Sequence, residues 1–250
     1  MAVFQAALVN ELDKLYRKKK VTVAIILSLL MIVIGQLLVV GVRTGFGLRG
    51  AGSLEFPMLV LSVVVNSILP LFTALVAIDS FSGEFSQNTM RITLTRPVSR
   101  FKIFSAKITA IAFFILTNLL LLLVFSTFAG LLFNANSATF GAFAKTLLSY
   151  FVSFIPMLVL ALAIVLLANL FKSGISVFFV AILAFAVLKA LGLAFSQYSG
   201  LFITSYLDWY NIWLANSFPW GKILRQLLIM AGYAIMLFTA GFYLFDKKEF

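Results

Sequence analysis

The sequence predicts an all-α membrane protein with six transmembrane helices, and three observations lead to this fold class. Of its 250 residues, 63% are hydrophobic and 11% are charged, whereas a soluble domain has about 25% charged residues. The apolar stretches are continuous, which argues against the short alternating strands of a membrane β-barrel. They are also long enough to supply about six helices of the ~20 residues that cross the hydrocarbon.

Residues 1–20 are expected to form an amphipathic helix in the membrane interface rather than a cleavable signal peptide. Polar residues such as Glu11 and Lys14 are expected on one face, and residues 17–20 are all basic. Bases and an apolar stripe can hold such a helix on anionic lipid. The alternatives are a simple positively charged anchor or a helix that also contacts a cytoplasmic partner. The stripe recurs at three- and four-residue steps: Phe4, Leu8, Leu12 and Leu15.

The six expected spans are joined by short loops without an evident linker or repeat, so residues 1–250 are interpreted as one domain. Pro70 lies inside the second span and predicts a kink there, and Asn66 is a polar residue of the same span. Pro156 lies inside the fourth span. The expected spans are residues 21–42, 57–78, 108–133, 146–171, 175–195 and about 225–245.

The distribution of Lys and Arg predicts that both termini are cytoplasmic. With that orientation, thirteen basic residues lie in inner segments and five in outer segments, as the positive-inside rule requires. Lys189 falls within the fifth span near its outer end, where its ammonium group can snorkel to the interface. The expected location is therefore the cell membrane.

The composition also excludes several classes of function. The net charge of +11 does not indicate a nucleic-acid-binding protein, because the bases gather at membrane edges rather than in one patch. The sequence has no Cys and no His, so thiolate chemistry, the usual zinc sites and histidine bases are absent. No acid lies in the middle of a span, and no phosphate-binding G-x-x-x-x-G-K-[ST] motif is present. The pattern favours an energy source on another chain.

Residues 79–107 form the one long polar segment within the apolar sequence, and they are expected to be a cytoplasmic loop. Ser82 is expected to cap a short helix that begins near Glu84. Pro97 ends this helix, and Ser99 is expected to cap the next one. Catalysis by the nearby acids Asp79 and Glu84 is disfavoured, since no other residues form a site around them. An ordinary solvated loop remains the alternative.

The same loop carries a resemblance to a known family. Gly83-Glu84 is followed by Thr89, Leu94 and residues 96–100, which read Arg-Pro-Val-Ser-Arg, and then by Lys107. This pattern resembles the first cytoplasmic loop of ABC-2 type transporter permeases. The amphipathic N-terminal helix, six spans and long outer loop before the last span are similar to that family over the whole chain. Asn88 and Arg91 depart from its usual Gly and acid.

The resemblance implies a permease subunit of an ATP-driven exporter with no enzymatic activity of its own. It implies two ABC ATPase subunits that carry ATP and Mg, and a second permease subunit, identical or homologous. The family arrangement would place spans two and five along the cargo path, with Asn66 as a candidate contact. An apolar path suits amphipathic or lipid-like cargo such as a peptide, an antibiotic or a lipid. The alternative is a non-transporting binding, immunity or assembly protein of the membrane. The coupling helix between spans two and three would dock through Glu84, Phe85, Thr89, Arg91, Arg96, Pro97, Ser99 and Arg100.

Residues 196–221 form the longest outer segment and are rich in aromatic residues. Trp and Tyr favour the membrane interface, so the segment is expected to lie there or to dip into the bilayer as short re-entrant helices. An aromatic belt without a role in recognition is one interpretation. An outer gate that closes a substrate path is the other.

Overall fold

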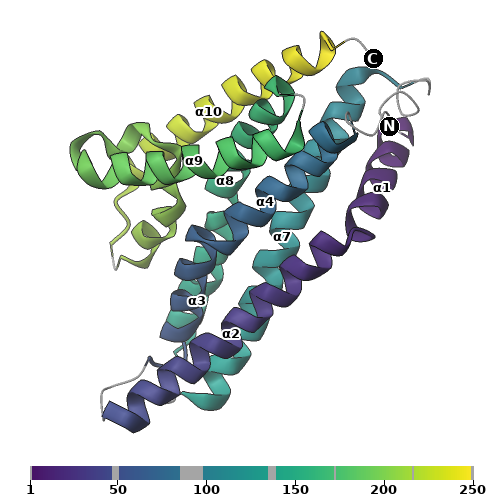
Figure 1. The fold of residues 1–250 in the computed structure, drawn as a ribbon. Coiled ribbons are helices and arrows are strands. Elements are labelled where there is room, and N and C mark those ends of the chain that lie inside the picture. The colour runs from purple at the N-terminus through teal and green to yellow at the C-terminus, as the bar shows by residue number, and fades with distance from the viewer. Residues whose placement is uncertain are drawn as a thin grey trace.

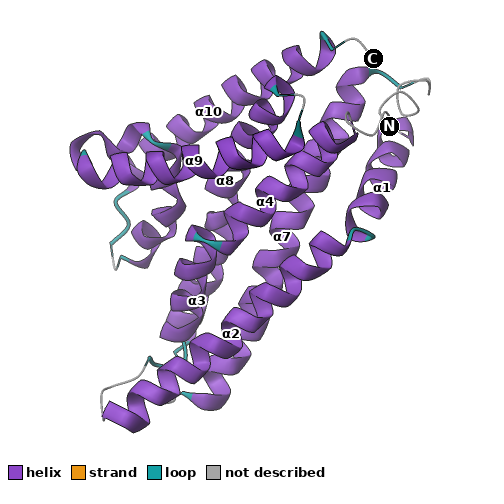
Figure 2. Ribbon diagram, viewed as in Figure 1, coloured by secondary structure: helices purple, strands orange, loops and turns teal. Residues whose placement is uncertain are grey.

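A computed structural model of the chain describes residues 2–46, 51–84, 98–134, 139–171, 173–215 and 217–248. Within these residues all regular secondary structure is helical (Figures 1 and 2). In chain order the elements are α1 (Ala2–Tyr16), α2 (Lys19–Phe46), α3 (Glu55–Asn66), α4 (Ile68–Ile78), the π-helix η1 (Asp79–Gly83), α7 (Arg100–Phe133), α8 (Phe140–Leu170), α9 (Gly174–Ala194), the 3₁₀ helices η2 (Ser196–Leu201) and η3 (Ile203–Leu214), and α10 (Trp220–Asp246).

Five of the described helices, α2, α7, α8, α9 and α10, are long and apolar enough to cross a membrane. The helix pair from Glu55 to Gly83 forms a sixth span if its two halves are counted together. The chain is therefore a multi-pass membrane protein, and the predicted number of spans agrees with this count. Helix α7 begins at Arg100, directly after the expected cap Ser99. Helices α8 and α10 begin about five residues before the predicted spans, at Phe140 and Trp220, because a helix can continue beyond the hydrocarbon edge.

The second span is broken at Ser67, where the axes of its two halves differ by 42°. Pro70 has no N–H group, so it cannot bond to the carbonyl of Asn66 four residues earlier. The kink expected from Pro70 is thus confirmed, and the break lies one turn before the proline. It leaves the polar residue Asn66 at the junction of two half-helices.

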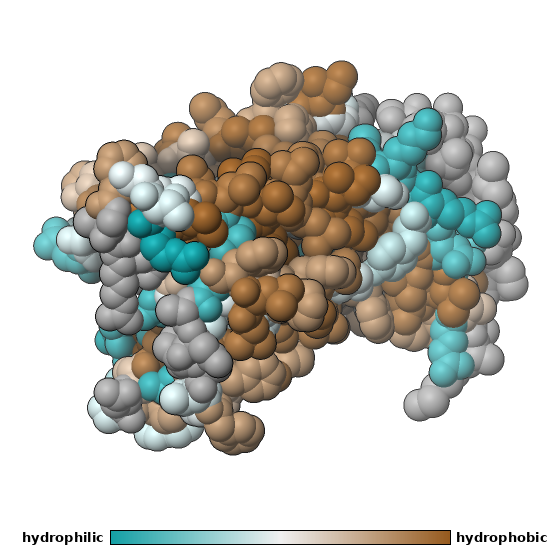
Figure 3. Space-filling model, turned by 90° about the horizontal axis from the view of Figure 1, so that it is seen from below, coloured by the Kyte–Doolittle hydropathy of each residue, from teal (hydrophilic) through white to brown (hydrophobic). Residues whose placement is uncertain are grey.

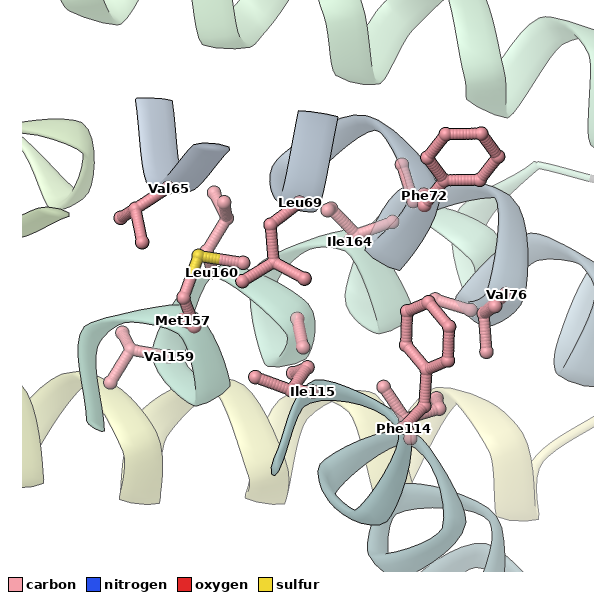
Figure 4. Close-up of a cluster of buried hydrophobic side chains, with 14 of the residues drawn as sticks. Val65, Leu69, Phe72, Val76, Phe114, Ile115, Met157, Val159, Leu160 and Ile164 are labelled. Atoms are coloured by element: carbon pink, nitrogen blue, oxygen red, sulfur yellow. The ribbon is translucent and has the colours of Figure 1, made fainter. Parts of the chain in front are cut away.

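The core lies where the bent span packs against α7 and α8. Figure 4 shows apolar side chains from all three: Val65, Leu69, Phe72 and Val76 from the bent span, Phe114 and Ile115 from α7, and Met157, Val159, Leu160 and Ile164 from α8. Phe114, Ile115 and Met157 are fully buried. Because lipid is as apolar as these side chains, close packing rather than exclusion of water holds such helices together.

Hydrogen bonds between helices and one close backbone approach fix the end of the bundle where α2 and α7 end and α3 begins. The Gln36 and Asn134 amides join α2 to the end of α7 by reciprocal bonds of 2.9 and 3.3 Å. The buried hydroxyl of Tyr150 donates to the Pro57 carbonyl at 2.8 Å. A Cβ at Gly130 would overlap the carbonyl oxygen of Ser53, so only glycine lets α7 approach the chain there.

The molecular surface has an apolar band between polar ends. Figure 3 shows hydrophobic residues across the middle of one face and hydrophilic residues toward both sides. Helix α9 contributes strongly to the exposed apolar surface, since among its residues only Val177 and Ala181 are buried. Helix α1, η1, the start of α7 and the end of α10 meet at one end of the bundle (Figure 1), which we call the α1 end.

Candidate functional site

The predicted coupling loop, residues 79–107, is described at its two ends. Glu84 follows η1 directly, whereas Ser99 and Arg100 lie at the start of α7. The predicted coupling helix falls outside the described residues, as do five of its predicted docking residues: Phe85, Thr89, Arg91, Arg96 and Pro97. The structure therefore bears on the base of the loop and on what its ends contact.

The end of the second span is a π-helix rather than a capped new helix. Ser82 lies inside this turn, is fully buried, and donates its hydroxyl to the Ala168 carbonyl of α8 at 2.8 Å. The expectation that Ser82 is an N-cap is wrong, because the span continues helically through it. Ser99 does hold the N-cap position of α7, but its side chain makes no capping hydrogen bond. Single π turns are frequent at functional sites.

Glu84 is part of a cluster of four charges, which we call the ion-pair cluster: Glu11, Lys14, Glu84 and Lys107. Lys107 and both carboxylates are buried, whereas the Lys14 side chain is 38% exposed. The Lys107 Nζ lies 2.7 Å from Glu84 Oε2 and 2.9 Å from Glu11 Oε2. The Lys14 Nζ lies 3.3 Å from Glu84 Oε1 and 3.1 Å from Glu11 Oε1. Each ammonium group thus bridges both carboxylates, and the cluster joins α1, the base of the loop and α7.

The sequence pattern of α1 explains how Glu11 reaches this cluster. Glu11 is 6% exposed and stands at helical spacing from Leu8 and Leu15, so it lies on the apolar stripe. The expectation that Glu11 lies on the polar face is therefore wrong. Leu8, Leu12 and Leu15 pack against the protein core, and α1 contacts α7. The stripe faces protein because Lys107 on α7 offers Glu11 a buried countercharge.

For Glu11 and Lys14, which lie outside the membrane spans, attraction to the opposite charges of the cluster outweighs the cost of burial. Burial by itself would raise the pKa of Glu11, but the Lys107 and Lys14 ammonium groups bring that pKa below its ordinary value of 4.5. Burial by itself would lower the pKa of Lys14, but Glu11 and Glu84 raise that pKa above 10.5. Both side chains are therefore charged at neutral pH, and the cluster contains as many positive as negative groups.

A second group of ion pairs ties the turn between α1 and α2 to the end of the second span. Asp79 Oδ1 lies 2.9 Å from Lys20 Nζ, and Asp79 Oδ2 lies 4.0 Å from Lys18 Nζ. Burial lowers the pKa of Lys18. These residues line a recess of about 550 Å³ with Lys14, Lys19, Gly83 and Glu84. The predicted interfacial helix is thus attached by charge at both its middle and its end.

Arg100 connects the other side of the loop to the C-terminal end of the last helix. Its Nη1 donates to the carbonyls of Asp246 and Lys248, the latter at 3.2 Å. Burial lowers the pKa of Lys248 to about 8. Helices α1, α7 and α10 and the bent span therefore meet around the base of the predicted coupling loop.

A second polar site lies at the break of the bent span, and we call it the outer triad: Asn66, Lys189 and Asp208. Asn66 Nδ2 donates to Asp208 Oδ1 at 2.7 Å, and Lys189 Nζ donates to Asn66 Oδ1 at 2.5 Å. Lys189 Nζ also lies 3.3 Å from Asp208 Oδ2. Lys189 therefore pairs within the protein. Asp208 was not among the predicted site residues, although it is the sole acid of residues 196–221.

Beside the outer triad is an apolar pocket of about 300 Å³ between α4, α8 and α9. Asn66 of α3 and Thr204 of η3 are among the polar residues that line it. The side chain of Thr204 is fully buried, and its Oγ1 has no hydrogen-bond partner among the described residues. The wall is otherwise almost entirely apolar and includes Pro70, Ala74, Leu160 and Leu188.

The aromatic outer segment forms η2 and η3, and η3 packs against α8. Tyr206, Trp209 and Tyr210 are buried. The Trp209 and Trp213 rings meet edge to face with centroids 5.4 Å apart. The segment is therefore a packed part of the bundle that carries Asp208 to the second span. Its predicted roles as a belt or as an outer gate remain predictions.

Comparison with known proteins supplies an independent line of evidence. Residues 7–187 match the family model described as ABC-2 family transporter protein. The matched region includes the ion-pair cluster, the loop and Asn66, and ends just before Lys189. No curated protein sequence matches the chain significantly.

Proposed function

The chain belongs to the ABC-2 family of transporter proteins and is a permease of an ABC transporter, and on that premise we propose that it exports amphipathic or lipid-like cargo from the cell. Two such permeases, identical or homologous, would pair in the cell membrane with both termini cytoplasmic. Two ABC ATPase subunits would bind ATP and Mg and dock on the predicted coupling loop, through the eight residues from Glu84 to Arg100 named above. Helix α1 would also contact membrane lipid.

The ion-pair cluster is the observation that carries this proposal. Glu84 is the first of the predicted docking residues, and it is bonded to Lys107 of α7 and to Lys14 of α1. A force applied to the loop would therefore act on the second span, the third span and α1 at once. Buried ion pairs have defined geometry, so the three elements would shift together rather than independently.

The fixed attachment of Glu84 supports a coupling role over an ordinary solvated loop. A solvated loop needs no buried countercharge at its base, and burying charges is costly unless each is paired. Lys107 is nevertheless fully buried against two carboxylates. Apolar residues at these positions would stabilise the fold equally well. The use of charged residues instead supports a role of the ion-pair cluster in transmitting motion.

Capture of partners from native membranes tests the proposal. A tagged wild-type chain should copurify an ATP-hydrolysing protein, and Glu84→Lys should lose most of it because a third cation would face Lys14 and Lys107. Glu55→Lys is the matched control, since Glu55 begins the same bent span at its opposite end. Thermal unfolding of each purified variant separates loss of docking from loss of folding.

The outcomes distinguish the candidate functions. An ATPase retained by wild type and Glu55→Lys but lost by a folded Glu84→Lys variant supports docking at this loop. An ATPase retained by the wild type and both variants, with unchanged coupled activity, would refute the role of Glu84. A folded wild-type chain that captures no ATP-hydrolysing protein would favour the non-transporting binding or assembly protein.

A further inference from the structure

The outer triad holds a carboxylate of the protein itself between two donors. The two oxygens of the Asp208 carboxylate accept from the Asn66 amide at 2.7 Å and lie 3.3 Å from the Lys189 ammonium. A neutral donor and a cation thus converge on one carboxylate. Asp208 is 43% exposed and Lys189 is 29% exposed, so this carboxylate sits at an accessible position.

The adjoining pocket suits the apolar part of the same ligand. Its volume of about 300 Å³ is at the lower end of the range for small-molecule sites, which are mostly apolar with a few placed polar groups. Asn66 belongs to both the triad and the pocket wall. A molecule lying in the pocket would therefore bring one end to the amide and ammonium groups.

Two further observations indicate a ligand with a negative or hydrogen-bond-accepting head. Thr204 lines the pocket, and its buried hydroxyl beside the pocket has no partner among the described residues. Helix α4 begins at the break, where no side chain caps its N-terminus. The N-terminus of a half-helix carries partial positive charge and attracts anionic groups in broken transmembrane helices.

We propose that this pocket binds an amphiphile whose apolar body lies between α4, α8 and α9 and whose anionic head displaces the Asp208 carboxylate from Asn66 and Lys189. Asp208 then acts as an internal substitute for the ligand. Because η3 carries both Asp208 and Thr204, the displaced carboxylate belongs to the segment that also forms part of the pocket wall. The inference rests on the proposed transport function only in identifying this ligand as cargo.

A ligand with a cationic head fits the site less well. Such a head would have to pair with Asp208 while Lys189 stays beside it, which places two cations together. Other bases lie toward the same end of the bundle among the described residues, namely Lys145, Lys222 and Arg225. An anionic head instead takes the place of the Asp208 carboxylate beside Asn66 and Lys189, and the displaced carboxylate, whose side chain is 43% exposed, is solvated by water.

Direct binding to the full-length chain in nanodiscs of zwitterionic lipid tests this proposal without any ATPase. The probes are radiolabelled dodecyl phosphate and dodecanol, which share an apolar chain and differ in the head group. Comparison among variants in identical nanodiscs removes the contribution of partition into lipid. Failure of this experiment leaves the docking test at Glu84 untouched, so the two proposals can fail separately.

Charge variants of the outer triad should have opposite effects on the anionic probe. Lys189→Gln should weaken dodecyl phosphate binding by about tenfold or more, since it removes a charged donor. Asp208→Asn should tighten the same binding, because it removes the internal competitor. Lys222→Gln is the matched control for loss of a cation from the same end of the protein, and dodecanol should respond little to any of the three.

Volume variants on α9 test the pocket. Ala184 lines it, whereas Ala186 of the same helix is exposed and does not. Ala184→Phe should therefore abolish binding of both probes, and Ala186→Phe should bind them as wild type does. Competition by phosphatidylglycerol in the nanodisc would identify the ligand as a membrane lipid. Lack of competition would identify it as a separate amphiphile.

Several results would overturn the proposal. Equal affinity for the two probes, or unchanged binding of dodecyl phosphate to Lys189→Gln, would show that the site does not recognise an anionic head. Weaker phosphate binding in Asp208→Asn would show that Asp208 helps to bind the ligand rather than competing with it. Equal binding by Ala184→Phe and Ala186→Phe would show that the probes bind outside the pocket.

Discussion

The ion pairs of Lys107 in the ion-pair cluster and those of Lys189 in the outer triad use the same chemistry at different degrees of burial, while the second cation of the cluster, Lys14, is 38% exposed. In the cluster, Lys107 is fully buried and each of its two carboxylate partners is nearly so. In the triad, Lys189 and Asp208 retain 29% and 43% exposure. Breaking a buried pair strands a charge, whereas water can replace a lost partner in an exposed pair. The first arrangement suits a permanent joint and the second suits exchange with a ligand.

Removing the central cation of the cluster should have the largest effect. Lys107→Met leaves Glu11 and Glu84 buried without their shared countercharge, which should lower the free energy of unfolding by roughly 3–5 kcal/mol. Thermal or denaturant unfolding in detergent measures this loss. Lys102→Met, an exposed position on the same helix, is the control. Equal stability of the two variants would show that the cluster does not hold the fold.

Acid and alkali should loosen α1 in a predictable way. The Glu11 pKa is lowered from 4.5, so its contribution is present above that value and is lost as pH falls through the lower folded pKa. The Lys14 pKa is raised from 10.5, so its contribution is present below that value and is lost as pH rises through the higher folded pKa. Attachment of α1 should therefore be strongest between these limits.

Thiol labelling can measure this attachment, because the chain has no cysteine of its own. Leu15→Cys places a thiol at a 4% exposed position on α1, and Val9→Cys places one at a 58% exposed position on the same helix. The reaction rate of Leu15→Cys with a pyridyl disulfide, divided by that of Val9→Cys, should rise in strong acid and in strong alkali. A ratio that stays constant with pH would contradict a role of charge in holding α1.

Substitution in the outer triad should have the smallest effect on stability. Lys189→Met should change the free energy of unfolding by only about 0–1 kcal/mol, as is typical of exposed ion pairs. The same unfolding measurement applies, so the value can be compared directly with that for Lys107→Met. A loss as large as that of Lys107→Met would make the triad a structural joint and would remove the contrast between the two sites.

The sequence predicted the class of the protein well because membrane insertion depends on local composition. Runs of about 20 apolar residues must become helices in lipid, whatever their neighbours are. Pro70 predicted the kink in the second span, since the missing N–H group acts within one turn. The resemblance carried by the loop predicted the family that the match over residues 7–187 shows.

The same reasoning failed where contacts join distant parts of the chain. Glu11 was expected on the polar face, yet it pairs with Lys107, 96 residues away. Its spacing from Leu8 and Leu15 was the available signal. Asp208 was not expected to reach Asn66, 142 residues earlier, because no local pattern links the outer segment to the middle of the second span.

By itself, the sequence determined that this chain is a multi-span helical membrane protein, since this property follows from hydropathy. Tertiary structure alone decided which charges meet. A carboxylate becomes part of a joint or of an exchangeable site only when packing places a particular ammonium group beside it and sets how much water remains. Packing therefore buries Glu84 in the ion-pair cluster and leaves Asp208 at an accessible position in the outer triad.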